Sequence, residues 1–270
     1  MRFLTQITLG VLCCALLSPT PVLAEEAMSR EALENFILDT IRDHPQVLLD
    51  ILRNNSETVL DIAQQGSNAR RLNVLQKQWQ KDLTVPKKMQ LHDRPILGNK
   101  NAKVKIVAFS DFACHYCQAS KSAVDAILKE FGDRVSFVFK SIPLDEKGPS
   151  AVAASWFLAI AKQNEEKAWE FYNIMFKNSD KLAADGENFI KKTAKELNLN
   201  VAKLEKDVKT DKKIKAILKE DHEDAEKLNV EGTPCFFVNN LAVRGAVPLE
   251  FFRVAVKMAL KDVNDKNQWS

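Results

Sequence analysis

Residues 104–117 read VKIVAFSDFACHYC, and they give the strongest indication of the fold. Its first six residues are mostly apolar and rich in β-branched side chains, which predicts a buried strand. Cys114 and Cys117 follow, and residues 119–131 then carry apolar side chains at helical spacing. A second strand is predicted at 135–139. The order strand, Cys-x-x-Cys, helix, strand predicts a βαβ unit with a right-handed crossover.

A cysteine pair at the start of a helix has a defined chemistry. Free backbone N–H groups and the helix dipole at the N-terminus stabilise a thiolate on Cys114. A stabilised thiolate is both a competent nucleophile and a good leaving group in disulfide exchange. Cys117 lies one turn further in, where it can resolve a mixed disulfide. The pattern therefore predicts thiol–disulfide exchange.

The rest of the chain from 103 to 264 completes an α/β domain. Apolar side chains at helical spacing fill residues 150–228, which predicts an almost wholly helical block. Two short strands are expected at residues 235–238 and 241–243, followed by a closing helix at 249–263. A frayed polar tail is expected at 265–270.

Residues 1–24 have the pattern of a secretory signal peptide. Arg2 gives a short positive region, residues 3–17 are mostly apolar, and Ala24 offers a small residue at the cleavage position. Removing Arg2 with this segment lowers the formal net charge from +3 to +2. A chain so close to neutral has no electrostatic footprint for nucleic acid.

Between the signal and the α/β domain lies a helical region, residues 25–85, followed by a linker at 86–102. Apolar residues recur there at spacings of three and four after a candidate cap at Ser29, and Pro45 interrupts the pattern. Because short amphipathic helices are marginal alone, these helices must bury their apolar faces against something. The region is therefore predicted to be an oligomerisation module.

The segment at 109–117, FSDFACHYC, resembles the active-site signature of the DsbA-like thioredoxin superfamily. Residues 232–234, Gly-Thr-Pro, resemble the cis-proline loop of that family, and residues 150–228 match its helical insertion. The likeness covers roughly residues 100–263. It implies an α/β thioredoxin-like fold with a helical insertion, preceded here by a small all-α region.

The resemblance also implies roles for individual residues. The bond before Pro234 would be cis, with the backbone of Thr233 facing Cys114 and pairing with an extended substrate segment. Cys114 and Cys117 would form the redox-active disulfide. Because the electrons then reside in the two cysteines, no bound cofactor and no metal are expected.

Two residues between the cysteines depart from DsbA, which carries a proline and then a histidine there. His115 comes first in this chain and Tyr116 second, and both are expected to tune the reduction potential. Tyrosine in that position, with Thr233 before the proline, is more similar to the isomerases DsbC and DsbG. The helical extension is similar to that of oligomeric DsbA-like proteins, including the copper-sensitivity suppressor type. These likenesses imply a homo-oligomer that forms or isomerises disulfide bonds, with a dimer favoured over a trimer.

The expected compartment is the bacterial periplasm. Substrates would be unfolded or misoxidised exported proteins, and a membrane protein of the DsbB or DsbD type would restore the redox state of the cysteine pair. The balance between oxidase and isomerase stays open at this point.

Other polar residues have weaker patterns. Asp111 and Lys140 are predicted to pair as a charged relay beneath Cys117, although two ordinary polar strand ends remain an alternative. Cys235 should point away from Cys114 into the core as an inert thiol, because side chains alternate along a strand. Three histidines show no ligand spacing, namely His44, His92 and His222.

Three other functions stay open beside disulfide isomerisation. The protein could be an oxidase only, or it could handle copper, because a thiol pair beside histidine suits a soft metal. A chaperone without turnover would keep its function after Cys114→Ala, whereas an enzyme would lose it. Structural zinc is disfavoured because no second Cys or His pair is present.

Overall fold

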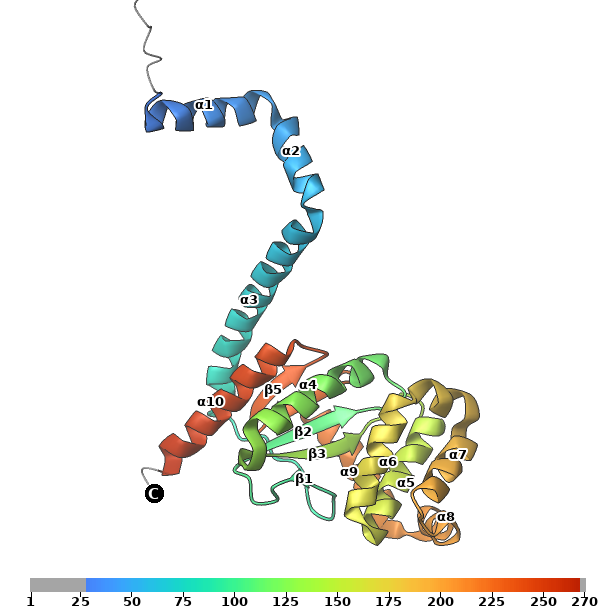
Figure 1. Ribbon diagram of the computed structural model, residues 1–270. Helices are drawn as coiled ribbons and strands as arrows, with labels where there is room; N and C mark the ends of the chain where they lie inside the picture. The colour runs from blue at the N-terminus through green and yellow to red at the C-terminus, as the bar shows by residue number, and fades with distance from the viewer. Residues whose placement is uncertain (1–27, 268–270) are drawn as a thin grey trace, which may run out of the picture. The chain divides into compact units, whose positions relative to one another are not determined.

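The computed structural model describes residues 28–267 (Figure 1). The chain divides into two compact units, residues 1–65 and 66–270. The predicted signal peptide lies outside the described residues, as do the last three residues of the predicted tail. Within the described range, no helix has the length and apolar character needed to cross a membrane.

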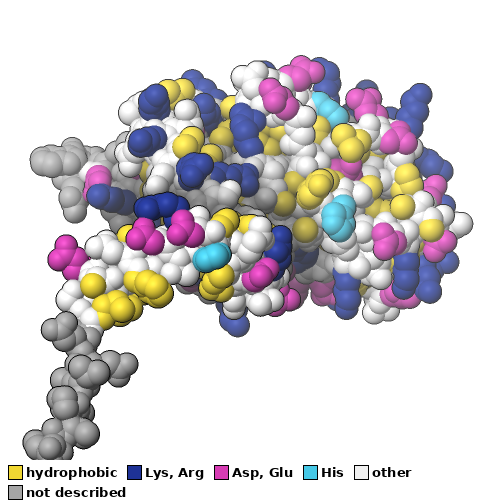
Figure 2. Space-filling view, turned by 90° about the horizontal axis from the view of Figure 1, so that it is seen from above, with side chains coloured by type: hydrophobic (Ala, Val, Ile, Leu, Met, Phe, Trp, Pro, Cys, Tyr) yellow, Lys and Arg dark blue, Asp and Glu magenta, His cyan; other side chains and the backbone are white. Residues whose placement is uncertain are grey.

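The first unit consists of helices α1 (Arg30–Asp43), α2 (Pro45–Asn54) and the start of α3 (Ser56–Asp82). The Ser29 hydroxyl caps α1 as predicted, accepting a hydrogen bond of 3.1 Å from the backbone N–H of Ala32. Pro45 begins α2, where its missing N–H leaves no hydrogen bond unmade. No residue of α1 or α2 is buried. Many of their apolar side chains are exposed, and apolar side chains are visible at the molecular surface in Figure 2.

Helix α3 spans the division between the two units. Residues 56–82 form one continuous helix of 27 residues, which crosses from the first unit into the second. Trp79 near its end is fully buried, and its indole N–H donates to the Ala242 carbonyl at 2.7 Å. The structure therefore divides the predicted region 25–85 between its two units after residue 65, and the role of that region in oligomerisation stays a prediction.

The strands of the described chain form one five-stranded sheet in the order β1-β3-β2-β4-β5. β2 and β3 are parallel, with Ile106 opposite Phe137, and the other neighbours are antiparallel. Helix α4 (His115–Phe131) connects β2 to β3, which confirms the predicted βαβ unit. The strands are β1 (Leu97–Gly98), β2 (Val104–Ser110), β3 (Val135–Ser141), β4 (Cys235–Val238) and β5 (Leu241–Arg244).

Strand β1 lies inside the predicted linker and was not expected. It has only two residues, too few for any periodicity. Gly98 adopts φ +88°, and a Cβ there would lie 3.1 Å from the Val135 carbonyl oxygen of β3. The glycine thus permits the close backbone approach of this edge strand.

The helical insertion between β3 and β4 is confirmed, and it comprises five helices in succession. A 3-10 turn, Gly132–Arg134, precedes β3. The last helix extends to Asn267, into the predicted tail, and no Gly or Pro stops it earlier. The five helices of the insertion are α5 (Pro149–Gln163), α6 (Glu165–Lys177), α7 (Ser179–Glu196), α8 (Val201–Thr210) and α9 (Lys212–Lys227), and α10 (Leu249–Asn267) follows β5.

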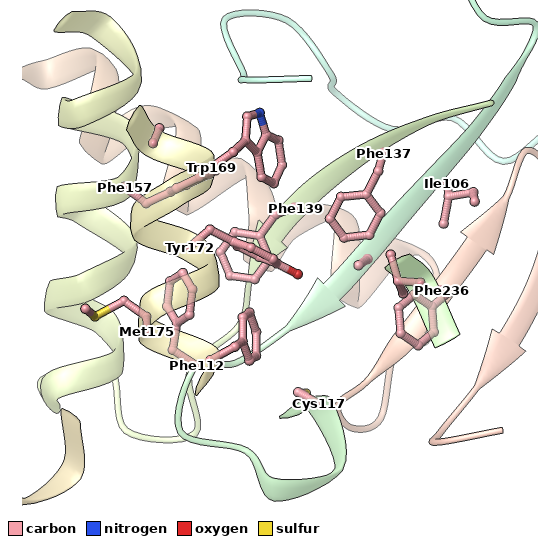
Figure 3. Packing of buried hydrophobic residues seen from close by; sticks show 14 of the residues in the cluster. Ile106, Phe112, Cys117, Phe137, Phe139, Phe157, Trp169, Tyr172, Met175 and Phe236 are labelled. Carbon is pink, nitrogen blue, oxygen red and sulfur yellow. The ribbon is translucent and has the colours of Figure 1, made fainter. Parts of the chain in front are cut away.

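Two buried clusters lie on opposite faces of the sheet. The larger one packs under α4, α10 and the insertion, and Figure 3 shows its aromatic rings around Phe112 and Tyr172, whose centroids are 5.7 Å apart. The smaller one contains Phe109 and Phe237, at 5.8 Å, on the face that α9 covers. Because successive side chains point to opposite faces, Ala108 and Phe109 fall into different clusters.

Candidate active site

Cys114 is the N-cap residue of α4. Its backbone is extended, with φ −81° and ψ 120°, and its carbonyl accepts hydrogen bonds of 3.1 Å from the N–H groups of Cys117 and Gln118. The first N–H groups of a helix have no intrahelical acceptor, so their dipoles stabilise a thiolate at this position. The Cys114 side chain is half-buried, so a partner sulfur can reach it.

Cys117 lies below, one turn into α4, and is only 4% exposed. Burial raises the pKa of its thiol to about 12, against the opposing hydrogen bonds of Ser110, Asp111 and Thr233. The Cys117 thiol also neighbours that of Cys114. The accessible sulfur and the shielded sulfur are thus arranged for attack by one and resolution by the other.

Thr233 and Pro234 complete the site from the loop before β4. The peptide bond between them is cis, as the family resemblance implies. The Cys114 thiol donates to the Thr233 carbonyl at 3.5 Å. The register of β4 against β2, with Cys235 opposite Phe109, places this loop beside the helix that carries the cysteines.

His115 and Tyr116 are both exposed on the first turn of α4, Tyr116 to 64%. Their ring centroids lie 5.8 Å apart at an interplanar angle of 68°. The two rings form the surface beside Cys114 that an incoming substrate would meet. Their predicted effect on the reduction potential stays a prediction.

Asp111 organises the loop that leads into Cys114. Its buried carboxylate accepts hydrogen bonds from the backbone N–H groups of Ala113, at 2.9 Å, and Leu144, at 3.2 Å, and from the hydroxyl of Ser150. The Ser150 hydroxyl in turn accepts from the N–H of Phe112 at 3.1 Å. Sequence reasoning missed Ser150, because a serine at the start of a predicted helix indicates only a cap.

The predicted pairing of Asp111 with Lys140 is wrong. Lys140 stands opposite Phe109 in the sheet and is fully buried on the face that α9 covers. Its ammonium lies 2.7 Å from Oδ2 of Asp224 and 3.2 Å from Oδ1 of Asp221. Asp111 follows the end of β2 and turns into the loop before Cys114, so no charged relay of these two residues lies beneath Cys117.

Four buried charges form a network around Lys140. Arg94 pairs with Asp221 at 2.6 Å, and Asp221 also accepts from the N–H of Ser141 at 2.9 Å. Asp224 accepts from the N–H of Gln90 at 2.7 Å. The network joins β3, α9 and the segment before β1. Its acids were missed because acidic residues on an amphipathic helix ordinarily face solvent.

Cys235 confirms its prediction. It is buried with Phe109 and Val138, on the opposite face of the sheet from Cys117, and burial raises the pKa of its thiol to about 11.

Residues 28–267 contain no group of three or more His, Cys, Asp or Glu side chains placed to hold a metal ion. His92 contacts Glu220 at 3.4 Å.

Comparison with known sequences finds a matching family and several relatives of this chain. A family described as Thioredoxin matches residues 90–258. The probable disulfide bond formation protein D of Bacillus anthracis is 36% identical over 160 residues, which cover 54% of this chain and 70% of that protein. A Na(+)/H(+) antiporter of Mycolicibacterium vanbaalenii is 28% identical over 152 residues, and the chain spans only 24% of its length.

Known structures agree in fold. A thioredoxin-like oxidoreductase from Silicibacter pomeroyi has a TM-score of 0.56 at 26% identity, over 63% of this chain and 94% of that one. BdbD from Bacillus subtilis has a TM-score of 0.57 at 21% identity, over 66% and 98%. ScsC from Proteus mirabilis in a transitional conformation has a TM-score of 0.55 at 20% identity, over 86% and 96%. The last two likenesses show the fold alone.

Proposed function

Because the chain belongs to the thioredoxin-like family of thiol–disulfide oxidoreductases, we propose that it forms and reshuffles disulfide bonds in exported proteins through Cys114 and Cys117. One observation carries this proposal. The half-buried Cys114 lies at the N-terminus of α4, within 3.5 Å of the cis-proline loop and above the shielded Cys117.

Oxidation of a substrate proceeds in two exchanges. A substrate thiolate attacks Sγ of Cys114, the bond between Cys114 and Cys117 breaks, and Cys117 leaves with the electron pair and takes a proton. A second substrate thiolate then attacks the substrate sulfur of the mixed disulfide and expels the Cys114 thiolate. Two electrons pass from the substrate to the cysteine pair, so the reaction needs no bound cofactor.

Isomerisation starts from the reduced pair. The Cys114 thiolate attacks a wrong substrate disulfide, and another substrate thiolate later displaces Cys114 from the mixed disulfide without net electron transfer. Cys117 releases a substrate that fails to rearrange. The backbone of Thr233 and Pro234 holds the extended substrate segment in both reactions, while His115 and Tyr116 set the potential.

A homo-oligomer built through the first unit favours isomerisation. The apolar side chains of α1 and α2 need a covering surface, and the likeness to ScsC extends over 86% of the chain, more than the second unit alone. A second copy of the chain, forming a dimer in preference to a trimer, would cover these faces. Each substrate would then meet more than one Cys114.

The proposed setting is the periplasm, reached through the signal peptide. Unfolded or misoxidised exported proteins would be the substrates, with no role for nucleic acid. An isomerase needs a reduced cysteine pair, for which a membrane reductant of the DsbD type is the matching partner. An oxidase would need a membrane oxidant of the DsbB type instead.

Reactivation of a scrambled-disulfide protein tests the proposal. The intact chain should restore activity, Cys114→Ala should abolish it, and Cys235→Ala is the matched control that should retain it. A chain beginning at Gly66 should still oxidise a small dithiol but reshuffle poorly, and the cut at this residue spares the buried Trp79. Full reactivation by Cys114→Ala would refute thiol chemistry, and equal reshuffling by both chains would limit the first unit to another role.

A further inference from the structure

A pocket of about 480 Å³ opens at the carboxyl end of β3, where α5 and α9 flank the strand. Its volume is that of sites that hold small ligands or a few side chains. Most of its lining is apolar, with a few polar groups among the aliphatic ones. The lining includes Ser141, Pro143, Val152, Ser155, Leu218 and His222.

Ser141 carries a polar atom that lacks a partner. The side chain is only 2% exposed, and its hydroxyl has no hydrogen-bond partner among the described residues. Buried hydroxyl groups nearly always have such a partner in folded proteins. Ser141 lines the pocket, so this unpaired hydroxyl belongs to the pocket wall.

The pocket borders the same edge of the sheet as the active site. β2 and β3 are parallel, with Ser110 opposite Ser141, so both strands end beside the loop that leads to Cys114. The N–H of Ile142 donates to the Ser110 carbonyl at 2.9 Å, and that of Leu144 donates to the Asp111 carboxylate at 3.2 Å. Open α/β sheets bind ligands at the carboxyl ends of their parallel strands.

Leu144 adds an apolar surface beside the pocket. Its side chain is 84% exposed, on the loop that also supplies Pro143 and Glu146 to the lining. A large apolar side chain held almost wholly in water beside an apolar pocket extends the surface that another polypeptide can cover.

We propose that this pocket binds an apolar side chain of the substrate polypeptide, a few residues away from the cysteine that reacts with Cys114. The inference rests on the proposed function, since it assumes a polypeptide attached to Cys114. Leu218, Val152 and Pro143 would contact the side chain, and the Ser141 hydroxyl would bond to the adjacent peptide group. The protein would accordingly prefer substrate cysteines that have an aliphatic or aromatic neighbour at one spacing.

Exchange equilibria with synthetic peptides test this preference. The full chain carrying Cys117→Ser is first capped on Cys114 with glutathione. Each peptide has one cysteine in a Gly-Ser background and a single leucine placed two to six residues away on either side. The peptide thiol displaces glutathione, forming the mixed disulfide with Cys114 and releasing one glutathione per peptide bound, which is quantified by chromatography.

One spacing of leucine should favour the mixed disulfide about tenfold over the peptide without leucine, the order expected for burying one aliphatic side chain. Leu218→Gln should remove that advantage. Leu260→Gln is the matched control, because Leu260 is also a half-buried helical leucine packed on the core but lies outside the pocket. Ser141→Ala should weaken binding of the preferred peptide several-fold without lowering stability, because its hydroxyl makes no bond to the described chain.

The pocket proposal fails if no spacing exceeds the leucine-free peptide by more than twofold, or if Leu218→Gln keeps the preference while remaining folded. Glutathione exchange at Cys114 separates this failure from failure of the proposed function. Normal exchange with no leucine preference overturns the pocket alone. Absence of exchange in the parent protein would overturn the redox function itself.

Discussion

The two units of the chain treat apolar side chains in opposite ways. In the first unit, Phe36 is 61% exposed and Leu60 is 68% exposed, and no residue of α1 or α2 is buried. In the second unit, aromatic side chains such as Phe112 and Phe157 are fully buried around the sheet. The second unit therefore has a core of its own, whereas the helices of the first unit need another surface to become stable.

This difference separates chemistry from assembly. Cys114, Cys117 and the cis-proline loop all lie in the unit with the complete core. Substitutions in the second unit should thus change unfolding and exchange together. Substitutions in the first unit should change assembly and leave both properties of the second unit intact.

The sharpest contrast comes from one pair of phenylalanines. Phe112→Ala should lower the free energy of unfolding by about 3–5 kcal/mol, because it removes a ring packed against Phe139, at 4.8 Å, and Tyr172. Phe36→Ala should change it by less than about 0.5 kcal/mol, as expected for an exposed position. Urea unfolding followed by tryptophan fluorescence measures both, and an equal loss from the two substitutions would contradict separate cores.

A buried lysine gives the next largest effect. Lys140→Met should lower the free energy of unfolding by about 3 kcal/mol. The buried carboxylates of Asp221 and Asp224 would then have only Arg94 left to balance their charge within the network. Lys162→Met is the matched control, because it breaks the more exposed ion pair with Asp211 and should cost under about 1 kcal/mol. Urea unfolding again decides, and equal costs would show that burial of the network is unimportant.

The contact between Asp111 and Ser150 links stability to chemistry. Ser150→Ala should lower the free energy of unfolding by about 1–2 kcal/mol, because it leaves the Phe112 N–H without its acceptor and removes a donor to Asp111. It should also slow exchange at Cys114, because the loop before α4 loses a fixed contact. Stopped-flow reaction with a disulfide reagent measures the rate. Ser155→Ala, on the same helix, is the control that should leave the rate unchanged.

The buried thiols predict a loss of stability in alkali for the reduced protein. Burial raises the pKa values of Cys117 and Cys235 above the value of 9.0 that each thiol has when unfolded. The contribution is fully present below pH 9 and falls as the pH rises through about 11 and 12. By pH 10 the loss should be on the order of 1 kcal/mol per thiol. Urea unfolding of the reduced Cys235→Ala variant should show half of the loss of stability at pH 10. A free energy of unfolding that does not change between pH 8 and pH 10 would contradict two buried neutral thiols.

Sequence patterns predicted the site where local rules decide position. Cys114 follows from a strand that ends before a helix, and burial of Cys235 follows from strand alternation. Lys140 and Ser150 could not be placed in this way, because their partners lie 84 and 39 residues away and depend on how the insertion docks. Strand β1 was missed because two residues are too few to show an alternation of apolar and polar side chains. The full length of α3, which spans both units, was missed because the apolar stripe of a helix can weaken where the helix itself continues.

A helix cap in the first unit gives the smallest expected effect and the most direct test of the comparison. Ser29→Ala removes the acceptor of the Ala32 N–H and should destabilise α1 by about 1 kcal/mol. No residue of α1 or α2 is buried, so the effect should be confined to the first unit. The helical signal in circular dichroism should fall slightly, and so should the fraction of assembled protein. Urea unfolding of the second unit and the rate of exchange at Cys114 should stay unchanged. A loss of either would mean that the core of the second unit depends on the order of the first.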